Sequence, residues 1–192
     1  MGRMADRRPG LTTPPAAAPS TRRWTVQRCL GGLAVVLLVL VVGSVTGLLP
    51  VQVMRVDSGS MAPTISTGDL VVVDRTAGSV HRGDVVVAPH PDTGSLLVKR
   101  AVALAGDQVG IEDGVLVVDG AAVCEPSIDP ALQDGVWFGP VTVPDGEVFL
   151  LGDDRGSSID SRDFGTVQAD AVVGQVGSRL WPAPGRLPVV DC

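Results

Sequence analysis

The chain has 192 residues, a mean hydropathy of +0.32 and a net charge of −6. This length suits one modest domain with additional segments, and the positive hydropathy indicates a hydrophobic segment. The charge argues against a nucleic-acid-binding protein, because an acidic body repels phosphate backbones.

The charge is distributed unevenly along the chain. Residues 1–28 hold six arginines and one acidic residue, a net charge of +5, which leaves −11 for the remainder. A basic head before an acidic body indicates sidedness at a membrane. The head is also rich in Pro, Ala and Thr, so residues 1–28 are predicted to form a disordered cytoplasmic tail.

An apolar segment follows the basic head. No charged residue occurs over residues 29–54, and residues 33–42 are almost purely aliphatic. A bilayer core needs about 20 apolar residues in a helix, so a transmembrane anchor is predicted over residues 29–49, ending before Pro50. The positive-inside rule places the N-terminus in the cytoplasm and the acidic body outside, on a single-pass cell-membrane protein.

A cleaved signal peptide is the alternative interpretation of this segment. The apolar run is longer than the roughly 7–15 residues of such peptides. A clean small-x-small cleavage site is also missing, since Val45, Thr46 and Gly47 form a poor one. Both observations favour a retained anchor.

The remaining residues, 50–192, are predicted to form an extracytoplasmic domain of β structure. Short β-branched runs bounded by turn residues indicate strands at 70–74, 84–87, 95–100, 147–151 and 171–176. Residues 109–123 are predicted to form a hairpin that turns at Asp113 and Gly114. No segment after residue 55 has helical periodicity, so the fold class is mostly β.

The cysteines and histidines predict neither a metal site nor a cofactor. No His/Cys cluster has metal-ligand spacing, and the chain has only two histidines. Cys124 and Cys192 can pair in an oxidising exterior or remain thiols, and the sequence favours neither outcome.

Lys99 is the only lysine, whereas the other fourteen basic residues are arginines. Arginine stays charged and cannot act as a base. Lys99 lies in the apolar run 96–102, and burial there would lower its pKa. A general base near neutrality needs a shift of about two to three units, or roughly 3–4 kcal/mol of desolvation. The alternative to a catalytic role is that Lys99 is a solvated lysine retained by chance in a chain biased toward arginine.

Two further segments carry candidate chemistry. In an extended segment Ser58 and Ser60 project to the same side, so one hydroxyl can attack while the other donates to the developing oxyanion. In the polar segment 152–165, Asp160 and Arg162 can pair and Ser158 can orient a lysine. Each segment alone also fits a plainer interpretation, an ordinary Ser/Gly turn and a solvated acidic loop.

Taken together and in order, the three segments resemble the conserved boxes of bacterial type I signal peptidases. Residues 58–64 resemble the nucleophile box, residues 99–107 the lysine box and residues 152–162 the third, structural box. The chain departs from the family pattern at Ala105, where proline is usual, and at Asp154, where asparagine is common. The segment between the last two boxes is short, so the cap-like insertion, at about 109–146, is expected to be reduced.

The resemblance implies a role for each matching residue. Ser60 would be the nucleophile, Lys99 the general base, and Ser58 would form the oxyanion hole with the Ser60 N–H. The implied orienting or structural residues are Ser158, Asp160, Arg162, Asp153 and Arg100, and the implied substrate-pocket residues are Met61 and Val98.

The resemblance also implies a substrate, the signal peptides of preproteins that emerge from the translocation machinery, cleaved after small residues in an Ala-x-Ala pattern. Ser60 follows Arg55, the first charge after the apolar run, by five residues. At about 3.3 Å per extended residue, Ser60 cannot lie more than roughly 17 Å beyond Arg55. The site is therefore expected at the surface of the lipid bilayer.

Two other functions compete with this interpretation. A Ser/His/Asp hydrolase would have to use His81 or His90, and both lie among turn residues. A membrane-anchored β module that only binds a partner, or an inactive relative of the peptidases, would leave the motifs structural. An inactive relative is expected to have lost Ser60 or Lys99, and both are present.

Overall fold

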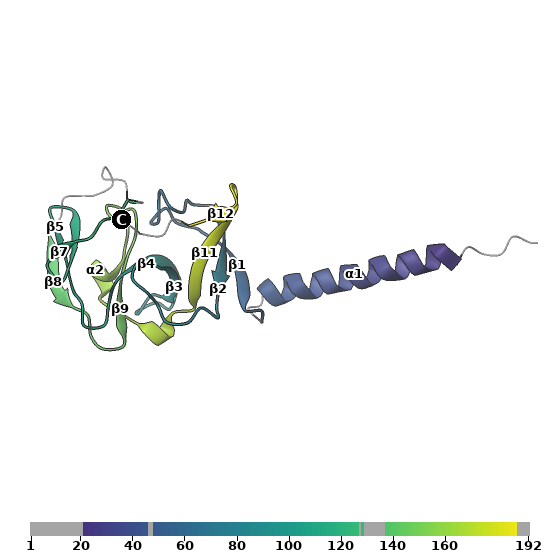
Figure 1. Ribbon diagram of the computed structural model, residues 1–192, viewed down its shortest axis with the longest axis horizontal. Coiled ribbons are helices and arrows are strands. Elements are labelled where there is room, and N and C mark those ends of the chain that lie inside the picture. The colour runs from purple at the N-terminus through teal and green to yellow at the C-terminus, as the bar shows by residue number, and fades with distance from the viewer. Residues whose placement is uncertain (1–20, 46–47, 127, 129–136, 188–192) are drawn as a thin grey trace, which may run out of the picture. The chain divides into compact units, whose positions relative to one another are not determined.

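The computed structural model describes residues 21–45, 48–126, 128 and 137–187 (Figure 1). The chain divides into two compact units, residues 1–40 and 41–192. The expected tail falls mostly within residues 1–20, outside the described residues.

The apolar segment forms a helix, α1 (Thr21–Val45), which ends earlier than the expected boundary at residue 49. No helix within the described residues is long and apolar enough to cross a membrane. The transmembrane helix predicted over residues 29–49 is therefore not confirmed.

The larger sheet has eight strands, and its pairings are antiparallel. Along the main path the strands follow the order β1 (Val51–Arg55), β2 (Leu70–Asp74), β11 (Gly174–Trp181), β3 (Val85–Pro89), β4 (Leu96–Leu104), β9 (Glu147–Leu151) and β10 (Val167–Gln168), and β12 (Gly185–Arg186) pairs with β11.

A second sheet lies at the opposite end of the domain from β1 (Figure 1). Its four strands follow the order β7 (Ala121–Ala122), β6 (Val115–Val118), β5 (Gln108–Glu112) and β8 (Phe138–Thr142). Asp113 and Gly114 join β5 to β6 with positive φ angles of 52° and 79°, as a two-residue turn of this kind requires. This confirms the predicted hairpin.

Alternation along the strands sets which face of the large sheet is buried. On β2, Val71 and Val73 enter a cluster with Met61 and Ile65, whereas Leu70 and Val72 are only partly buried on the other face. On β3 four successive residues from Val85 are buried, so this central strand is covered on both faces. Strands predominate among the described elements of the domain, which confirms the mostly β fold class.

The described helical elements after residue 55 are short. α2 (Ser161–Phe164) is a single turn, and η2 (Ala169–Ala171) is a 3-10 turn at the start of a predicted strand. The Asp160 side chain caps α2 by accepting from the Arg162 backbone N–H, and Asp163 completes a capping box. The sequence has no helical periodicity after residue 55 because four residues are too few for a 3.6-residue period to appear.

Candidate active site

Ser58 and Ser60 lie in the loop between β1 and β2, which is closed at its base. The Val56 N–H donates to the Asp69 carbonyl, and the Gly68 N–H donates to the Val56 carbonyl. Met61 and Ile65 are buried in the core beneath the loop. The loop is therefore anchored by its apolar residues, while Ser58 stays exposed and Ser60 half-buried.

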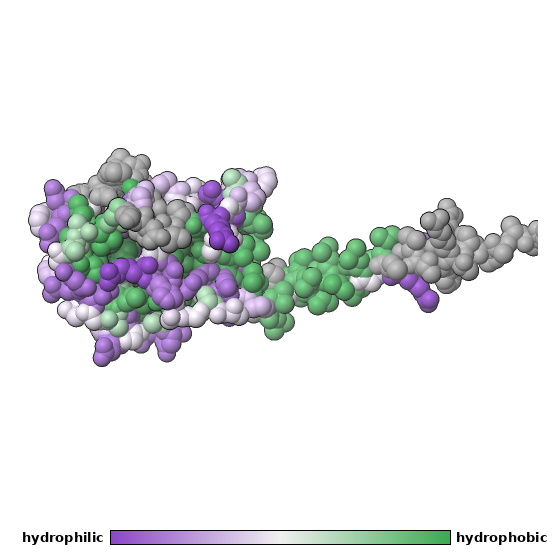
Figure 2. Space-filling model, in the orientation of Figure 1, coloured by the Kyte–Doolittle hydropathy of each residue, from purple (hydrophilic) through white to green (hydrophobic). Residues whose placement is uncertain are grey.

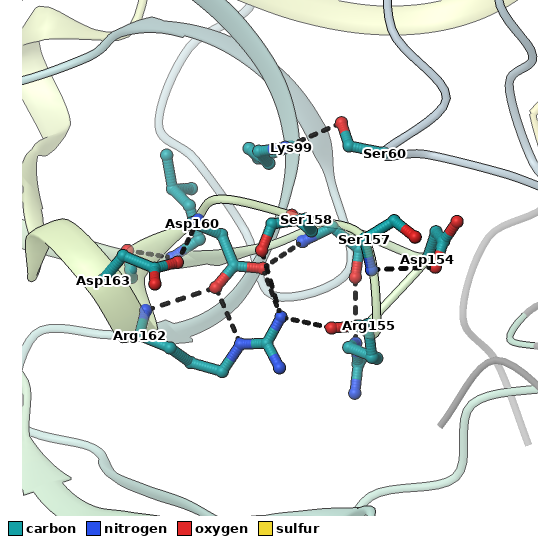
Figure 3. A network of polar contacts seen from close by, with 12 residues as sticks. Ser60, Lys99, Asp154, Arg155, Ser157, Ser158, Asp160, Arg162 and Asp163 are labelled. Atoms are coloured by element: carbon teal, nitrogen blue, oxygen red, sulfur yellow. Dashed lines mark hydrogen bonds and ion pairs between the residues drawn. The ribbon is translucent and has the colours of Figure 1, made fainter. Parts of the chain in front are cut away.

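Lys99 lies on β4, where it pairs in register with Val86 of β3. Its side chain reaches the loop of residues 56–69 between β1 and β2, here called the nucleophile loop. Its side chain is only 3% exposed. The Lys99 Nζ lies 2.7 Å from the Ser60 Oγ, and the contact is seen at the top of the network in Figure 3. The fold thus brings together the two residues for which sequence reasoning predicted proton transfer.

Burial lowers the pKa of Lys99 below its ordinary value of 10.5, because desolvation penalises the ammonium form. Asp160 acts against burial and raises this pKa, and Arg162 partly offsets Asp160 by lowering it. Asp153 and Asp163 also raise it, more weakly. The net direction favours a neutral amine, the form that can accept a proton from a serine hydroxyl.

Ser58 and Ser60 face the same region. Their hydroxyl oxygens are 3.3 Å apart. An oxyanion that forms on a carbonyl attacked by the Ser60 Oγ would develop within reach of the Ser58 hydroxyl. The arrangement can therefore supply a nucleophile, a base and an oxyanion donor from side chains alone.

Arg100, the neighbour of Lys99, forms a buried ion pair. Its Nε and Nη2 donate to the two carboxylate oxygens of Asp153 at 2.8 and 2.6 Å, and the two side chains are 1% and 0% exposed. Its Nη1 donates to the Gly83 carbonyl, and its Nη2 also reaches the Thr64 hydroxyl at 3.5 Å. Arg100 thus ties the strand of Lys99 to both the nucleophile loop and residue 153.

The segment of residues 152–162, here called the site loop, is held by a second buried carboxylate. Asp160 accepts from the Gly152 N–H and from the Nε of Arg162 at 3.0 and 2.9 Å. Arg162 also donates to the Arg155 carbonyl at 2.6 Å. Figure 3 shows Asp160 and Arg162 on the side of the loop below Lys99.

The site loop also touches the nucleophile loop directly. The Asp154 N–H donates to the Ser60 carbonyl at 3.1 Å. Gly152 permits this approach, because a Cβ at that position would overlap the Ser60 carbonyl oxygen and the Ser158 hydroxyl. The glycine is therefore required by packing of the two loops.

Three predicted residues are placed without the contact that their roles would need. The Ser158 hydroxyl is buried and has no hydrogen-bond partner among the described residues. Met61 is 1% exposed and belongs to the core, and Val98 is half-buried against the same cluster. The orienting role of Ser158 and the substrate-pocket roles of Met61 and Val98 remain predictions.

Neither histidine forms a hydrogen bond with Ser60 in the described part of the chain. The His81 side chain is 74% exposed and lies 3.5 Å from Asp84. The His90 ring packs against Phe164, and its Nδ1 accepts from the Asp92 N–H. This geometry does not support the alternative Ser/His/Asp hydrolase.

Sequence reasoning missed one ion pair that reaches the site loop. Glu125 pairs with Arg155 at 2.5 Å, with the side chains 6% and 2% exposed. Glu125 lies far from every motif in the sequence, so no spacing signal could have found it. Its neighbour Cys124 is disulfide-bonded, and the partner cysteine is not among the described side chains.

A serine hydroxyl within hydrogen-bond distance of a buried lysine amine, on a mostly β scaffold, suits a serine hydrolase that uses lysine as its base. The comparisons with known proteins identify the chain as a serine peptidase. A sequence model of the family described as "Signal peptidase, peptidase S26" matches residues 28–181. The chain therefore belongs to the signal peptidase family and is a serine peptidase, a hydrolase.

Two sequence relatives agree with this assignment. Signal peptidase I of Bacillus caldolyticus is 37% identical over 142 residues, which cover 66% of this chain and 78% of the relative. Signal peptidase I T of Bacillus subtilis is 34% identical over 131 residues, which cover 62% and 68% of the two chains. A solved signal peptidase I from Enterococcus faecalis aligns with a TM-score of 0.46 and 28% identity, over 52% of this chain and 98% of its own.

Proposed function

We propose that this chain is a membrane-bound endopeptidase that removes signal peptides from translocated preproteins, with Ser60 as nucleophile and Lys99 as general base. The observation that carries the proposal is the 2.7 Å approach of the Lys99 Nζ to the Ser60 Oγ, with the amine buried. The names of the relatives supply the substrate class, preproteins with signal peptides.

The reaction begins with proton transfer from the Ser60 hydroxyl to the neutral Lys99 amine. The Ser60 Oγ then forms a bond to the scissile carbonyl carbon, and the carbonyl oxygen becomes an oxyanion. Collapse of this intermediate breaks the C–N bond, and the Lys99 ammonium returns the proton to the leaving amine. The product at this stage is an ester between Ser60 and the signal peptide.

Hydrolysis of the ester repeats the same steps with water. Lys99 accepts a proton from a water molecule while the water oxygen attacks the ester carbonyl carbon. The proton then passes to the Ser60 Oγ as the bond between that oxygen and the carbonyl carbon breaks. In both steps the Ser58 hydroxyl and the Ser60 N–H are the proposed donors to the oxyanion. The 3.3 Å separation of the two hydroxyl oxygens supports this role for Ser58.

The buried carboxylates are proposed to hold the base in place rather than to react. Arg100 pairs with Asp153 and Arg162 pairs with Asp160, so the two carboxylates that raise the pKa of Lys99 most each have a guanidinium partner. An unpaired carboxylate beside the amine would stabilise the ammonium and oppose its action as a base. Ser158 is proposed to orient the Lys99 amine when substrate is bound.

The lipid bilayer is the proposed second partner of the domain. The outer face of the large sheet near β1 is apolar: Val51 and Val53 are 44% and 40% exposed, and on β11 Leu180 and Trp181 are 46% and 63% exposed. In the register, Val53 lies opposite Val72, and Trp181 lies opposite Leu70. Figure 2 shows apolar surface at the edge of the domain that carries β1 and β2.

An exposed apolar face of this kind, with a tryptophan on it, suits contact with lipid. The uncharged run 29–54, whose last four residues belong to β1, supports a single-pass anchor before the domain, with the N-terminus cytoplasmic and the catalytic domain outside. The proposal therefore includes an active site that works at the outer membrane surface.

The test is a cleavage assay with a preprotein that carries an Ala-x-Ala site, using the full chain in detergent or vesicles. Ser60→Ala and Lys99→Arg are each expected to abolish cleavage without unfolding the domain, and His81→Ala and His90→Ala are expected to retain it. Undiminished turnover by Ser60→Ala or Lys99→Arg would refute the mechanism. Loss of activity in a folded histidine variant would favour the Ser/His/Asp alternative.

A further inference from the structure

A buried ion pair connects the small sheet to the site loop from the side away from Lys99. Glu125 lies shortly after β7, in the segment through which the chain leaves β6 and β7. The Nη2 of Arg155 donates to the Glu125 carboxylate, and both side chains are nearly inaccessible to water. In Figure 3 the Arg155 side chain extends away from Lys99.

Arg155 depends strongly on this carboxylate. Its Nε donates to the Gly152 carbonyl at 2.9 Å, and its Nη1 is buried without a hydrogen-bond partner among the described residues. A buried guanidinium that loses its counter-charge is strongly destabilised, so removal of Glu125 is expected to displace Arg155.

The backbone of Arg155 supports the residues below Lys99. Its carbonyl accepts from the Nη2 of Arg162, which in turn donates to Asp160. The adjacent Asp154 N–H donates to the Ser60 carbonyl. A shift at residue 155 is therefore transmitted to both members of the Asp160–Arg162 pair and to the nucleophile loop.

We propose that Glu125 is a positioning residue for the peptidase reaction: through Arg155 it holds the site loop so that Arg162 stays engaged with Asp160 beneath Lys99. This role rests on the proposed function of Ser60 and Lys99. It gives the small sheet a part in catalysis, because the segment that follows its strand β7 supplies the carboxylate.

The electrostatics of Lys99 determine the direction of the expected effect. The charged groups acting on Lys99 are Asp153, Asp160, Asp163 and Arg162, and among them Asp160 most strongly raises its pKa while Arg162 lowers it. If Arg162 disengages, Asp160 is less well compensated and the pKa of Lys99 rises. The acid limb of kcat/KM, which reports the fraction of neutral amine, then moves to higher pH.

The test compares pH profiles of kcat/KM for preprotein cleavage by the full-length wild type and three variants. Glu125→Gln is expected to move the acid limb up by about one unit, which lowers kcat/KM about tenfold below the limb and leaves the high-pH plateau near the wild-type value. Glu125→Asp, which keeps the charge, is expected to move the limb less. Glu112→Gln, an exposed carboxylate on β5 of the same sheet, is the matched control and is expected to leave the profile unchanged.

A merely structural role for Glu125 would lower the melting temperature, or lower the plateau at every pH, without moving the limb. That result in Glu125→Gln would overturn the proposal. If Glu125→Gln fails to fold, the Glu125→Asp profile decides, and a limb at the wild-type position overturns the proposal. Failure of the proposed function is distinguishable, because it would appear as retained cleavage by Ser60→Ala.

Discussion

The Lys99 Nζ and the Ser60 Oγ lie 2.7 Å apart, although the two residues are separated by 39 positions in the chain. The amine is 3% exposed and its pKa is lowered by burial. This contact places a buried amine with a lowered pKa against a hydroxyl, without a histidine.

Replacement of Lys99 by methionine is expected to stabilise the domain below pH 10. The folded state lowers the pKa of Lys99 whereas the unfolded state leaves it near 10.5, so the buried ammonium costs about 1.4 kcal/mol for each unit of the shift. Because the unfolded chain binds the extra proton between these two pKa values, wild-type stability rises with pH across that window. The advantage of Lys99→Met should therefore be greatest below the lowered pKa and should shrink as pH approaches 10.5.

Denaturant unfolding of Lys99→Met and wild type at a series of pH values measures this difference. If the difference in free energy of unfolding between the two proteins is the same at every pH, Lys99 has the same pKa in the folded and unfolded states, which contradicts the prediction. The comparison of the two proteins removes the contributions of the other titrating groups, which are common to both.

Removal of the Ser58 hydroxyl is expected to slow the reaction without weakening substrate binding. One lost oxyanion donor lowers kcat by roughly 10²–10³-fold, because the interaction is made only in the transition state. Ser58→Ala should show this fall in kcat with KM nearly unchanged, measured with a saturable peptide substrate. Ser66→Ala, an exposed serine of the same loop, is the control, and equal effects in the two variants would contradict the role of Ser58.

The Arg100–Asp153 pair is expected to be essential to stability. Asp153→Asn leaves a fully buried guanidinium without its carboxylate, and breaking such a pair costs about 3–5 kcal/mol. Chemical denaturation should report a loss of this size. Asp119→Asn is the matched control, because its carboxylate is 56% exposed and 4.0 Å from Arg82, and a surface pair of this kind contributes about 0–1 kcal/mol. Similar losses in both variants would contradict the prediction.

The rate of cleavage is expected to rise with pH through the lowered pKa of Lys99. Below that pKa the amine is an ammonium and cannot accept the Ser60 proton, so kcat/KM should fall about tenfold for each pH unit. A pH series of kcat/KM at fixed ionic strength measures the limb. If kcat/KM instead does not change with pH up to the pH range in which an ordinary lysine titrates, the base is a group other than Lys99.

The residues of the site could largely be predicted from the sequence, because they occur in three short segments of distinctive composition. Lys99 could be identified because it is the only lysine of the chain and lies in an apolar strand. Ser58 and Ser60 could be identified because they are two positions apart in the same short segment. Their mutual distance could not be predicted, since it depends on how β4 and the nucleophile loop meet in the large sheet. The partner of Arg100, Asp153, likewise becomes evident only when residues 53 positions apart are brought together.

Strands rich in valine were predictable, whereas elements with weaker local signals were not. β1 lies at the end of the uncharged run 29–54, and β8 contains Gly139 and Pro140, which interrupt a strand pattern. Glu125 carries no local signal because its role comes from burial against Arg155, a tertiary contact. The short helix α2 depends on the Asp160 cap, which also pairs with Arg162.

The most direct test of the account is an NMR titration of the lysine side chain. Because Lys99 is the only lysine, protein labelled at lysine yields one side-chain signal that needs no assignment. The account predicts that this signal titrates below 10.5, and that Ser60→Ala leaves it below that value. A titration at or above 10.5 would show that the amine is protonated at working pH, and would contradict its role as the base.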